Sequence, residues 1–167
     1  MDRYASTESS GSNGLIQINI ENPDQPQVRA LLDAGDAYMS SLYPPESNHT
    51  LDLKSLQKPG VTFLVARDDG QAVACIALVD SGDDWMEIKR MFVSPAARGR
   101  KVGRLLLNKL ESMAADKGAP LLRLEAGPKQ PEALALYRSA GYVERGPFGN
   151  YRPDPLSVFM EKQLARV

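Results

Sequence analysis

The chain has 167 residues, of which 43% are hydrophobic, and its 20 Lys and Arg residues face 21 Asp and Glu residues for a formal net charge of −1. This length suits one domain with a sizeable core and would be cramped for two. A near-neutral chain has no general electrostatic attraction to nucleic acid or to an anionic membrane, so neither is an expected partner. The single cysteine, Cys75, excludes an internal disulfide and a multi-thiolate metal site, which fits a reducing compartment such as the cytoplasm.

The N-terminal segment differs in composition from the rest of the chain. Residues 1–14 are polar and rich in Ser and Gly, and we interpret them as a flexible tail that precedes a single domain of residues 15–167. They lack the apolar core of a secretory signal. The longest apolar runs, such as VACIALV, are too short to span a bilayer, so the sequence predicts a soluble protein with no membrane association.

The first half of the domain is predicted to contain two helices and four strands. A strand is expected at 15–20, and a helix at 27–43 with apolar residues at roughly helical spacing, ended by Pro44-Pro45. A brief helix at 51–57, with Thr50 as its cap, follows. Strands at 61–66, 71–79 and 85–93 are separated by short turn sequences, which predicts an antiparallel meander.

The second half alternates helices and strands. We predict a helix at 102–117, a buried strand at 121–126, a helix at 130–141, and final strands at 142–145 and 156–163. The strand–helix–strand unit from about 85 to 125 requires a crossover and a parallel strand pair. The expected fold is a single-domain α/β structure with a mixed central sheet of about six to seven strands, flanked by about four helices.

Positive charge is concentrated where one predicted strand meets one predicted helix. The stretch MFVSPAARGRKVGRLLL covers residues 91–107, and six of the 20 cations fall between Lys89 and Arg104, a window without any acid. The first turn of a helix has unpaired backbone N–H groups and the equivalent of about half a positive charge, so cations there oppose the dipole unless an anion binds. The residues that would surround such an anion are Arg98, Gly99, Arg100, Lys101, Val102, Gly103 and Arg104.

A pyrophosphate group would satisfy this junction. The two glycines let backbone amides approach a bulky anion, and the cations supply the opposite charge. The alternative is a solvated basic turn with incidental glycines. Neither G-x-x-x-x-G-K-[ST] nor a G-x-G-x-x-G after a strand is present, which argues against an ATPase or a dinucleotide enzyme.

Two motifs resemble signatures of the GNAT acyltransferases. FVSPAARGRKVGRLLL is similar to their acetyl-CoA signature, in which Arg or Gln, two residues, Gly or Ala, one residue, and Gly or Ala follow a strand. Arg98, Val102 and Gly103 match this register, whereas Lys101 stands where a small residue is usual. ALALYRSAGYVERG resembles the second signature, a Tyr-bearing helix that ends at Gly-aromatic. The resemblance covers about residues 15–163.

The resemblance implies acetyl-CoA as cofactor and direct acetyl transfer to an amine, with no metal. It places the pantetheine arm along Met91, Phe92 and Val93, the pyrophosphate on residues 98–104, and a further pantetheine contact at Gln130. It also implies that Tyr137 is the general acid that protonates the departing thiolate. On its own, the position of Tyr137 in the helix is equally typical of a core aromatic residue with a polar tip.

An ammonium acceptor must lose a proton before it can attack, and two carboxylates are candidates for the base. Glu87 is the first choice, because period-two alternation puts it on one strand face with Lys89, Met91 and Val93, and because histone-modifying GNAT enzymes have a carboxylate base at a similar place. The alternative for Glu87 is an ion pair with Lys89 or a neighbouring strand. Glu125, at the end of the next strand, is the reserve candidate and an expected acceptor-site residue.

The acceptor site is expected near the loop YPPESNH. Tyr43, Glu46 and the only histidine, His49, could hold a small polar acceptor there, although a lone loop histidine is more often a solvated side chain. The segment RGPFGNYRPDPL is too long for a tight hairpin, so it either caps the acceptor site or meets a second subunit. Cys75 lies in mid-strand, the setting of an inert buried thiol.

The predicted function is acetyl-CoA-dependent N-acetyl transfer. The balanced charge and short chain favour a small-molecule amine over a chromatin or ribosomal target, and a homodimer is expected because relatives often form dimers. A different interpretation makes the chain a non-catalytic acyl-CoA-binding sensor or interaction module. A basic module for nucleic acid would need positive charge beyond one junction and aromatic stacking platforms, which the composition does not provide.

Overall fold

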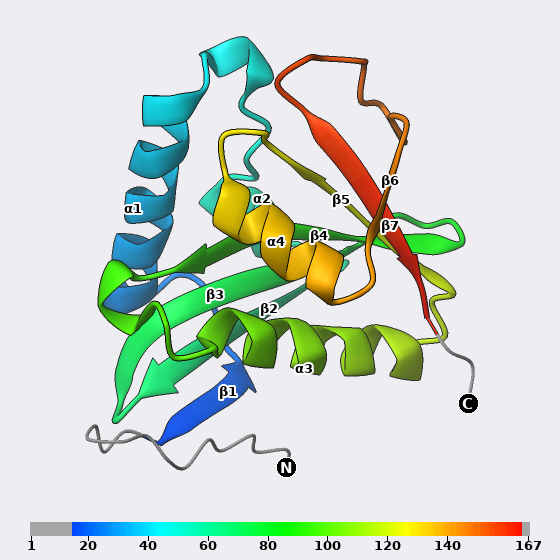
Figure 1. The fold of residues 1–167 in the computed structure, drawn as a ribbon. Coiled ribbons are helices and arrows are strands. Elements are labelled where there is room, and N and C mark those ends of the chain that lie inside the picture. The colour runs from blue at the N-terminus through cyan, green and yellow to red at the C-terminus, as the bar shows by residue number, and fades with distance from the viewer. Residues whose placement is uncertain (1–14, 165–167) are drawn as a thin grey trace.

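A computed structural model describes residues 15–164, so the predicted tail at 1–14 lies outside the described residues (Figure 1). The first half contains the elements β1 (Ile16–Ile20), α1 (Pro26–Leu42), a 3₁₀ turn (Pro45–Ser47), α2 (Leu53–Leu56), β2 (Val61–Asp68), β3 (Gln71–Asp80) and β4 (Trp85–Val93). The second half contains a 3₁₀ turn (Pro95–Ala97), α3 (Val102–Asp116), β5 (Leu121–Ala126), α4 (Pro131–Ser139), β6 (Val143–Arg145) and β7 (Val158–Gln163). The described residues thus confirm the predicted α/β fold.

One predicted detail of the first half is wrong. The cap of α2 is Asp52 rather than Thr50, because the Asp52 side chain accepts a hydrogen bond from the backbone N–H of Ser55 at 2.8 Å. A carboxylate two residues further along the chain reaches the free amides of this short helix.

The strands form one mixed sheet of seven strands in the order β1-β2-β3-β4-β5-β7-β6. Neighbouring strands are antiparallel except β4 and β5, which are parallel and are joined by the crossover helix α3. The β4/β5 ladder runs from Trp85↔Leu121 to Ile88↔Leu124 and ends there, although β4 continues to Val93. The sheet therefore opens between the C-terminal ends of its two central parallel strands.

Helices cover both faces of the sheet (Figure 1). On one face, α3 and α4 pack through Leu106, Leu110 and Leu134 on strand residues such as Ile76 and Ile88. On the other face, α1 and α2 pack on a second set of strand residues, and this smaller core contains Val28, Leu32, Leu56, Phe63, Val65, Cys75 and Ala77. The alternation of side chains along the strands supplies both cores at once.

A bulge in β4 changes which of its side chains share a face. Ala77 of β3 pairs with Lys89, whereas Cys75 pairs with Phe92, so β4 has one extra residue between these pairs. Arg90 lies in this stretch and has a φ of 61°. Because each added residue reverses the alternation, Met91 and Val93 pack into the core under α3 and α4.

The bulge overturns one prediction. Glu87 and Lys89 were expected to share a face with Met91 and Val93, and this is wrong. Lys89 pairs with Ala77 and Phe92 pairs with Cys75, which puts Lys89 and Phe92 on the α1 side of the sheet. Strict period-two counting fails because it cannot register an inserted residue.

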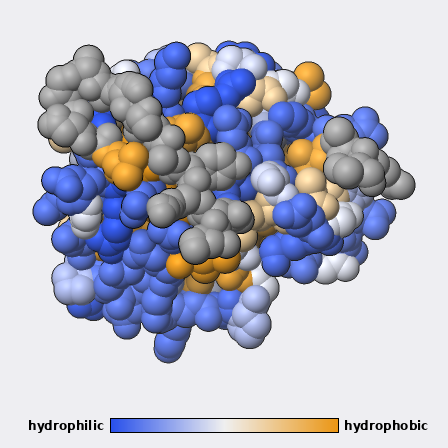
Figure 2. All heavy atoms as spheres, turned by 90° about the horizontal axis from the view of Figure 1, so that it is seen from below, coloured by the Kyte–Doolittle hydropathy of each residue, from blue (hydrophilic) through white to orange (hydrophobic). Residues whose placement is uncertain are grey.

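The surface on the side of α3 and β1 is mainly hydrophilic, with hydrophobic side chains in small separate areas (Figure 2). The large hydrophobic residues that are exposed within residues 15–164 are Leu15, Ile20 and Val143. Within the same range, no helix combines the length and apolar character needed to cross a membrane. Most of the apolar content of the described chain is thus used in the two cores.

Replacement of Gly127 by Ala should destabilise the fold. A Cβ atom at Gly127 would lie 1.7 Å from the hydroxyl oxygen of Tyr43, whose ring is 4% exposed and cannot swing into solvent. Overpacking of this kind costs about 1–3 kcal/mol of the free energy of unfolding, which urea denaturation would measure. Gly146→Ala is the control, because no heavy atom lies within 4 Å of its added Cβ; equal stability of the two variants would contradict the prediction.

Candidate active site

A cleft of about 780 Å³ lies where β4 and β5 separate. Its walls come from Lys89–Val93 of β4, the end of β5, one side of α1, the first turn of α3, and α4. Parallel strands that part leave backbone N–H and C=O groups without sheet partners, so a bound molecule can pair with them. The cleft therefore joins a backbone-lined channel to a helix N-terminus.

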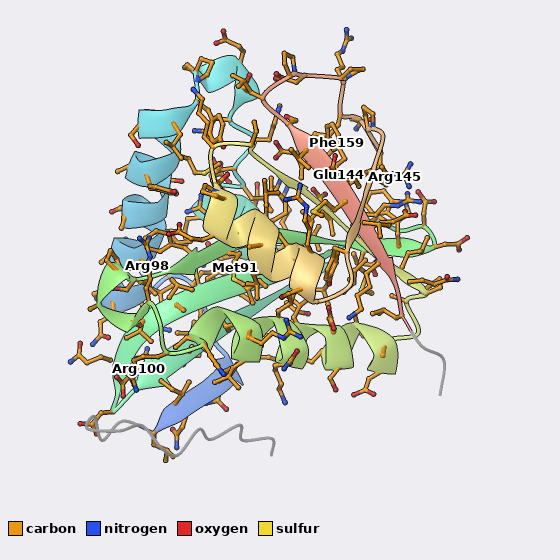
Figure 3. The ribbon with its side chains drawn as sticks, viewed as in Figure 1. Met91, Arg98, Arg100, Glu144, Arg145 and Phe159 are labelled. Carbon is orange, nitrogen blue, oxygen red and sulfur yellow. The ribbon has the colours of Figure 1, made fainter. Side chains whose placement is uncertain are left out.

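The basic junction forms the mouth of this cleft. Arg98, Gly99, Lys101, Gly103 and Arg104 all line it, and Arg98, Gly99 and Lys101 are exposed to solvent. Figure 3 shows Arg98 on the loop that precedes α3, and Met91 beside α4. Arg104 donates a hydrogen bond to the Ser139 hydroxyl at 2.9 Å, which ties the start of α3 to the end of α4. Free amides, a helix dipole and several cations thus converge at one end of the cleft.

Lys101 is the N-cap of α3 and adopts the left-handed conformation, with φ 62° and ψ 23°. Few residues other than Gly, Asn and Asp adopt this conformation readily. Glycine would adopt this turn without strain, whereas Lys101 adopts it with a Cβ present. Because the Lys101 side chain is exposed while its backbone makes the turn, the left-handed turn still presents the α3 amides to the cleft.

Gly103, by contrast, is needed for close packing. A Cβ there would lie 3.3 Å from Leu136 of α4 and 3.6 Å from Met91 of β4. Its small size lets α4 approach the first turn of α3 beside the cleft.

Arg100 stands apart from the other cations. Its guanidinium forms an ion pair with Asp68 at the end of β2, and it is not among the residues that line the cleft. Val102 is buried in the core under α3, so only its backbone is available to a ligand.

The remaining residues expected at the cofactor lie along the cleft. Met91, Phe92 and Val93 follow its β4 wall, and Gln130 lies at the N-cap of α4. The Oε1 atom of Gln130 accepts hydrogen bonds from the Gly127 backbone N–H at 3.1 Å and from the Tyr43 hydroxyl at 3.4 Å. This fixes the side-chain amide of Gln130 at the cleft edge.

Tyr137 also lines the cleft, although its ring is only 5% exposed. It lies on α4, and its ring meets that of Tyr142 edge-on with 5.7 Å between the centroids. Burial raises the pKa of Tyr137 above its ordinary value of 10, so the phenol keeps its proton at neutral pH. The side chain is a proton donor held in one orientation by its neighbours.

Glu87 does not line the cleft. Its Oε2 atom accepts a hydrogen bond from the Tyr151 hydroxyl at 2.6 Å and lies 3.7 Å from the Lys89 ammonium. Lys89 in turn donates to the Tyr151 hydroxyl at 2.8 Å and to the backbone oxygen of His49 at 2.7 Å. The structure thus places Glu87 in a small buried network of partners.

Glu125 lines the cleft on the α1 side of the sheet. Its place follows from the strand pairing: Arg123 pairs with Glu87, and Glu125 is two residues further along β5 on the same face. Burial raises the pKa of Glu125 to about 7, while the nearby Ser157 hydroxyl and Lys89 ammonium limit the rise, and the carboxylates of Glu87 and Asp154 add to it. This carboxyl group therefore titrates close to neutral pH.

The three loop residues expected at the acceptor site lie in different environments. His49 lines the cleft and packs edge-on against Tyr151, with 5.3 Å between the ring centroids. Tyr43 is buried under the β5–α4 loop, where its hydroxyl accepts a hydrogen bond from Lys129 N–H at 3.0 Å, and Glu46 is exposed. Neither Tyr43 nor Glu46 lines the cleft.

Sequence reasoning singled out the segment RGPFGNYRPDPL by its length but did not name Tyr151 as a site residue. The segment between β6 and β7 folds back over the sheet, and its aromatic residues pack on one another and on Phe159 of β7. Ser47 donates a hydrogen bond to Asp154 at 2.7 Å, which links this segment to the loop that carries His49. The length of the segment was the available signal, but the sequence did not specify which side chain would reach Glu87 and Lys89.

Comparisons with known proteins identify relatives that match most of the chain. Residues 28–142 match the family described as "Acetyltransferase (GNAT) family". An "IAA acetyltransferase" of Azospirillum brasilense is 49% identical over 150 residues, which are 89% of this chain and 98% of that protein. The "Uncharacterized N-acetyltransferase YsnE" of Bacillus subtilis is 33% identical over 89% of this chain and 100% of that protein.

A solved structure also matches over most of the chain. It comes from Klebsiella pneumoniae, carries the provisional name acyl-CoA N-acyltransferase, and has a TM-score of 0.76 at 37% identity, covering 90% of this chain and 98% of that one. Fold, cleft and relatives together define an acyl-CoA-dependent acyltransferase. The chain belongs to the acetyltransferase (GNAT) family, and it transfers the acetyl group of acetyl-CoA to an amine nitrogen.

The residues present fit acetyl-CoA. The mouth offers free α3 amides beside Arg98, Lys101 and Arg104 for a pyrophosphate, and the channel between β4 and α4 is narrow and largely apolar, as a pantetheine arm requires. Bound there, acetyl-CoA supplies the acetyl group as an activated thioester. The predicted fold, family and cofactor are thus confirmed.

Replacing Arg98 and Arg104 together by Gln should weaken the binding of coenzyme A. Both side chains line the mouth, so the double variant loses two positive charges near the pyrophosphate. The Kd of coenzyme A, measured by calorimetry, should rise more at low salt than at high salt. This is because high salt already screens the attraction between these exposed arginines and the pyrophosphate. Arg100→Gln is the matched control, since Arg100 is engaged with Asp68. An equal rise in Kd for the control would show that net charge, and not position, matters.

Proposed function

We propose that this enzyme acetylates a small-molecule amine, with Glu125 as the general base and Tyr137 as the general acid. The observation that carries this assignment is that both side chains line one cleft, with Glu125 on the α1 face of the sheet and Tyr137 on the helix that covers the opposite face. A base for the acceptor and an acid for the leaving sulfur must act from different sides of the reacting carbonyl.

The base assignment moves from Glu87 to Glu125 for a physical reason. Glu87 accepts a short hydrogen bond from Tyr151 and lies near the Lys89 ammonium, so its charge is already compensated, and it has no place on the cleft wall. Glu125 lines the cleft, and a carboxylate with a pKa near 7 accepts a proton at neutral pH more readily than one with an ordinary pKa. Its negative charge also attracts an ammonium acceptor.

The acid assignment rests on the burial of Tyr137. Burial keeps the phenol of Tyr137 protonated at neutral pH, so it can donate its proton to the thioester sulfur as the C–S bond breaks, and coenzyme A leaves as the neutral thiol. The tyrosinate regains a proton from solvent after the products leave. In this proposal, backbone N–H groups of β4 beyond Ile88, where the β4/β5 ladder has ended, stabilise negative charge on the acetyl oxygen. Arg98, Lys101, Arg104 and the α3 amides hold the pyrophosphate in this proposal.

The acceptor is a small molecule in this proposal, because α1 and His49 line the cleft, and the hydrogen bond from Ser47 to Asp154 holds the loop that carries His49. We extend the proposal to residues 15–167 as one catalytic domain preceded by a tail at 1–14, to a homodimer and to a cytoplasmic location. The single cysteine supports a reducing compartment, since Cys75 is buried and burial raises the pKa of its thiol to about 12.

Tyr137→Phe should lower kcat by about 10²- to 10⁴-fold, the usual loss when a general acid is removed. Release of free thiol from acetyl-CoA with an accepted amine would measure this. The binding of coenzyme A should change little, because the ring remains in place. Turnover at the parental rate would eliminate Tyr137 as the acid.

Glu125→Gln should remove one ionisation from the pH profile. In the parent enzyme the base must be deprotonated to act. We therefore expect kcat/KM to increase as the pH rises through about 7, the pKa of Glu125, and to be low at more acidic pH. The amide variant should lose this limb and most of its activity. Glu87→Gln serves as the comparison, and loss of the limb in that variant instead would return the base role to Glu87.

A further inference from the structure

The wall that α1 presents to the cleft is apolar apart from Tyr38. Leu31, Leu32, Gly35 and Met39 line it on successive turns of the helix, and Phe92 of β4 lies opposite Gly35. This wall lies on the same face of the sheet as Glu125 and Lys89. The part of the cleft nearest the proposed base thus has a hydrophobic side that the reaction chemistry does not explain.

Gly35 is the unusual member of this wall. It lies in the interior of α1, where Gly is about 1 kcal/mol less favourable than Ala. Its backbone does not require glycine, because it is not among the positive-φ positions. A Cβ there would lie 3.5 Å from the nearest Phe92 ring carbons, an ordinary contact, whereas a Cβ at Gly127 would collide with Tyr43. Neither conformation nor packing therefore accounts for glycine at this position.

The cations on this side of the cleft already have partners. The Arg90 side chain is 6% exposed, forms an ion pair with Asp36 and donates to the backbone oxygen of Leu32 at 3.0 Å. Lys89 is bound to Tyr151 and His49 and lies close to Glu87. A carboxylate on the acceptor would have to displace these partners, so an anionic acceptor is disfavoured.

We propose that the part of the cleft lined by α1 and Phe92 is an apolar subsite, which a side chain larger than alanine at position 35 would narrow, and that the acceptor is a small amine with one positive charge and an apolar body that occupies it. This inference rests on the proposed function, because it takes Glu125 as the group that receives the ammonium. The carboxylate meets the charged end of the acceptor, and Leu31, Leu32, Met39 and Phe92 remove its apolar body from water.

Three amines test the class of acceptor. 2-Phenylethylamine has one ammonium and an apolar body, ethylamine lacks the body, and 1,4-diaminobutane replaces it with a second charge. We expect kcat/KM, followed by thiol release from acetyl-CoA, to be at least about 10-fold higher for 2-phenylethylamine than for either of the others. A preference for the diamine, or equal rates for all three, would overturn the proposal.

Gly35→Leu tests the subsite itself. Because a Cβ at this position already contacts Phe92, the rest of the leucine side chain must extend into the cleft, and it should lower kcat/KM for 2-phenylethylamine by about 10- to 200-fold, with little effect on ethylamine. Ala34→Leu is the matched control, because it adds an apolar side chain one position away on the exposed side of α1. Equal loss for both amines, or an equal effect of the control, would contradict the subsite.

A second readout separates this inference from the proposed function. Calorimetry in the presence of coenzyme A should show weaker binding of 2-phenylethylamine to Gly35→Leu than to the parent, and the same Kd for Ala34→Leu. Binding with this pattern but without turnover would refute the proposed chemistry and keep the subsite, whereas turnover with an unchanged Kd would refute the subsite alone. Gly35→Met, whose side chain also extends beyond the Cβ position, replaces Gly35→Leu if that variant does not fold, and the same selective loss for 2-phenylethylamine is expected.

Discussion

The separation of β4 from β5 after four paired residues is the constraint on which the rest of the structure depends. Two parallel strands in the middle of a sheet would normally stay paired along their length, because each lost ladder position leaves backbone groups without partners. Here β4 stays paired with β3 and separates from β5, and the bulge at Arg90 lies at the point of separation. The resulting opening gives a ligand access to strand backbone in the centre of the domain, where helices on both faces exclude water.

The bulge and the separation act together. Because one extra residue reverses the alternation of β4, Met91 and Val93 pack toward α3 and α4, whereas Lys89 and Phe92 face α1. The proposed cofactor side of the cleft and the proposed acceptor side are therefore built from successive residues of one strand. Arg90 adopts an unfavourable positive φ, and its guanidinium ties α1 to this strand through Asp36 and Leu32, so the wall of the acceptor side is held at the bulge.

The charges on the acceptor side are divided between paired and unpaired groups. Lys89 and Glu87 share Tyr151, which the segment between β6 and β7 brings over the sheet. Figure 3 shows Phe159, on which this segment packs, on β7 beside Glu144 and Arg145 of β6. Burial raises the pKa of Glu125, and the nearby Ser157 hydroxyl and Lys89 ammonium limit this rise. Glu87 is therefore engaged by Tyr151 and Lys89, whereas Glu125 lines the cleft and remains available to a ligand.

The sequence by itself determined the order of elements, the crossover helix and the basic mouth, because helical and strand periodicity, turn residues and the charge of a helix N-terminus are local properties of the chain. It also identified Glu87, Glu125, Tyr137 and His49 as candidate site residues. Only the tertiary structure decided how these groups were used. Tyr151 donates a hydrogen bond to Glu87 from 64 positions away in the chain, and Arg100 forms an ion pair with Asp68. The bulge at Arg90 reverses the alternation of side chains along β4. Each of these features depends on contacts between distant segments that no local pattern encodes.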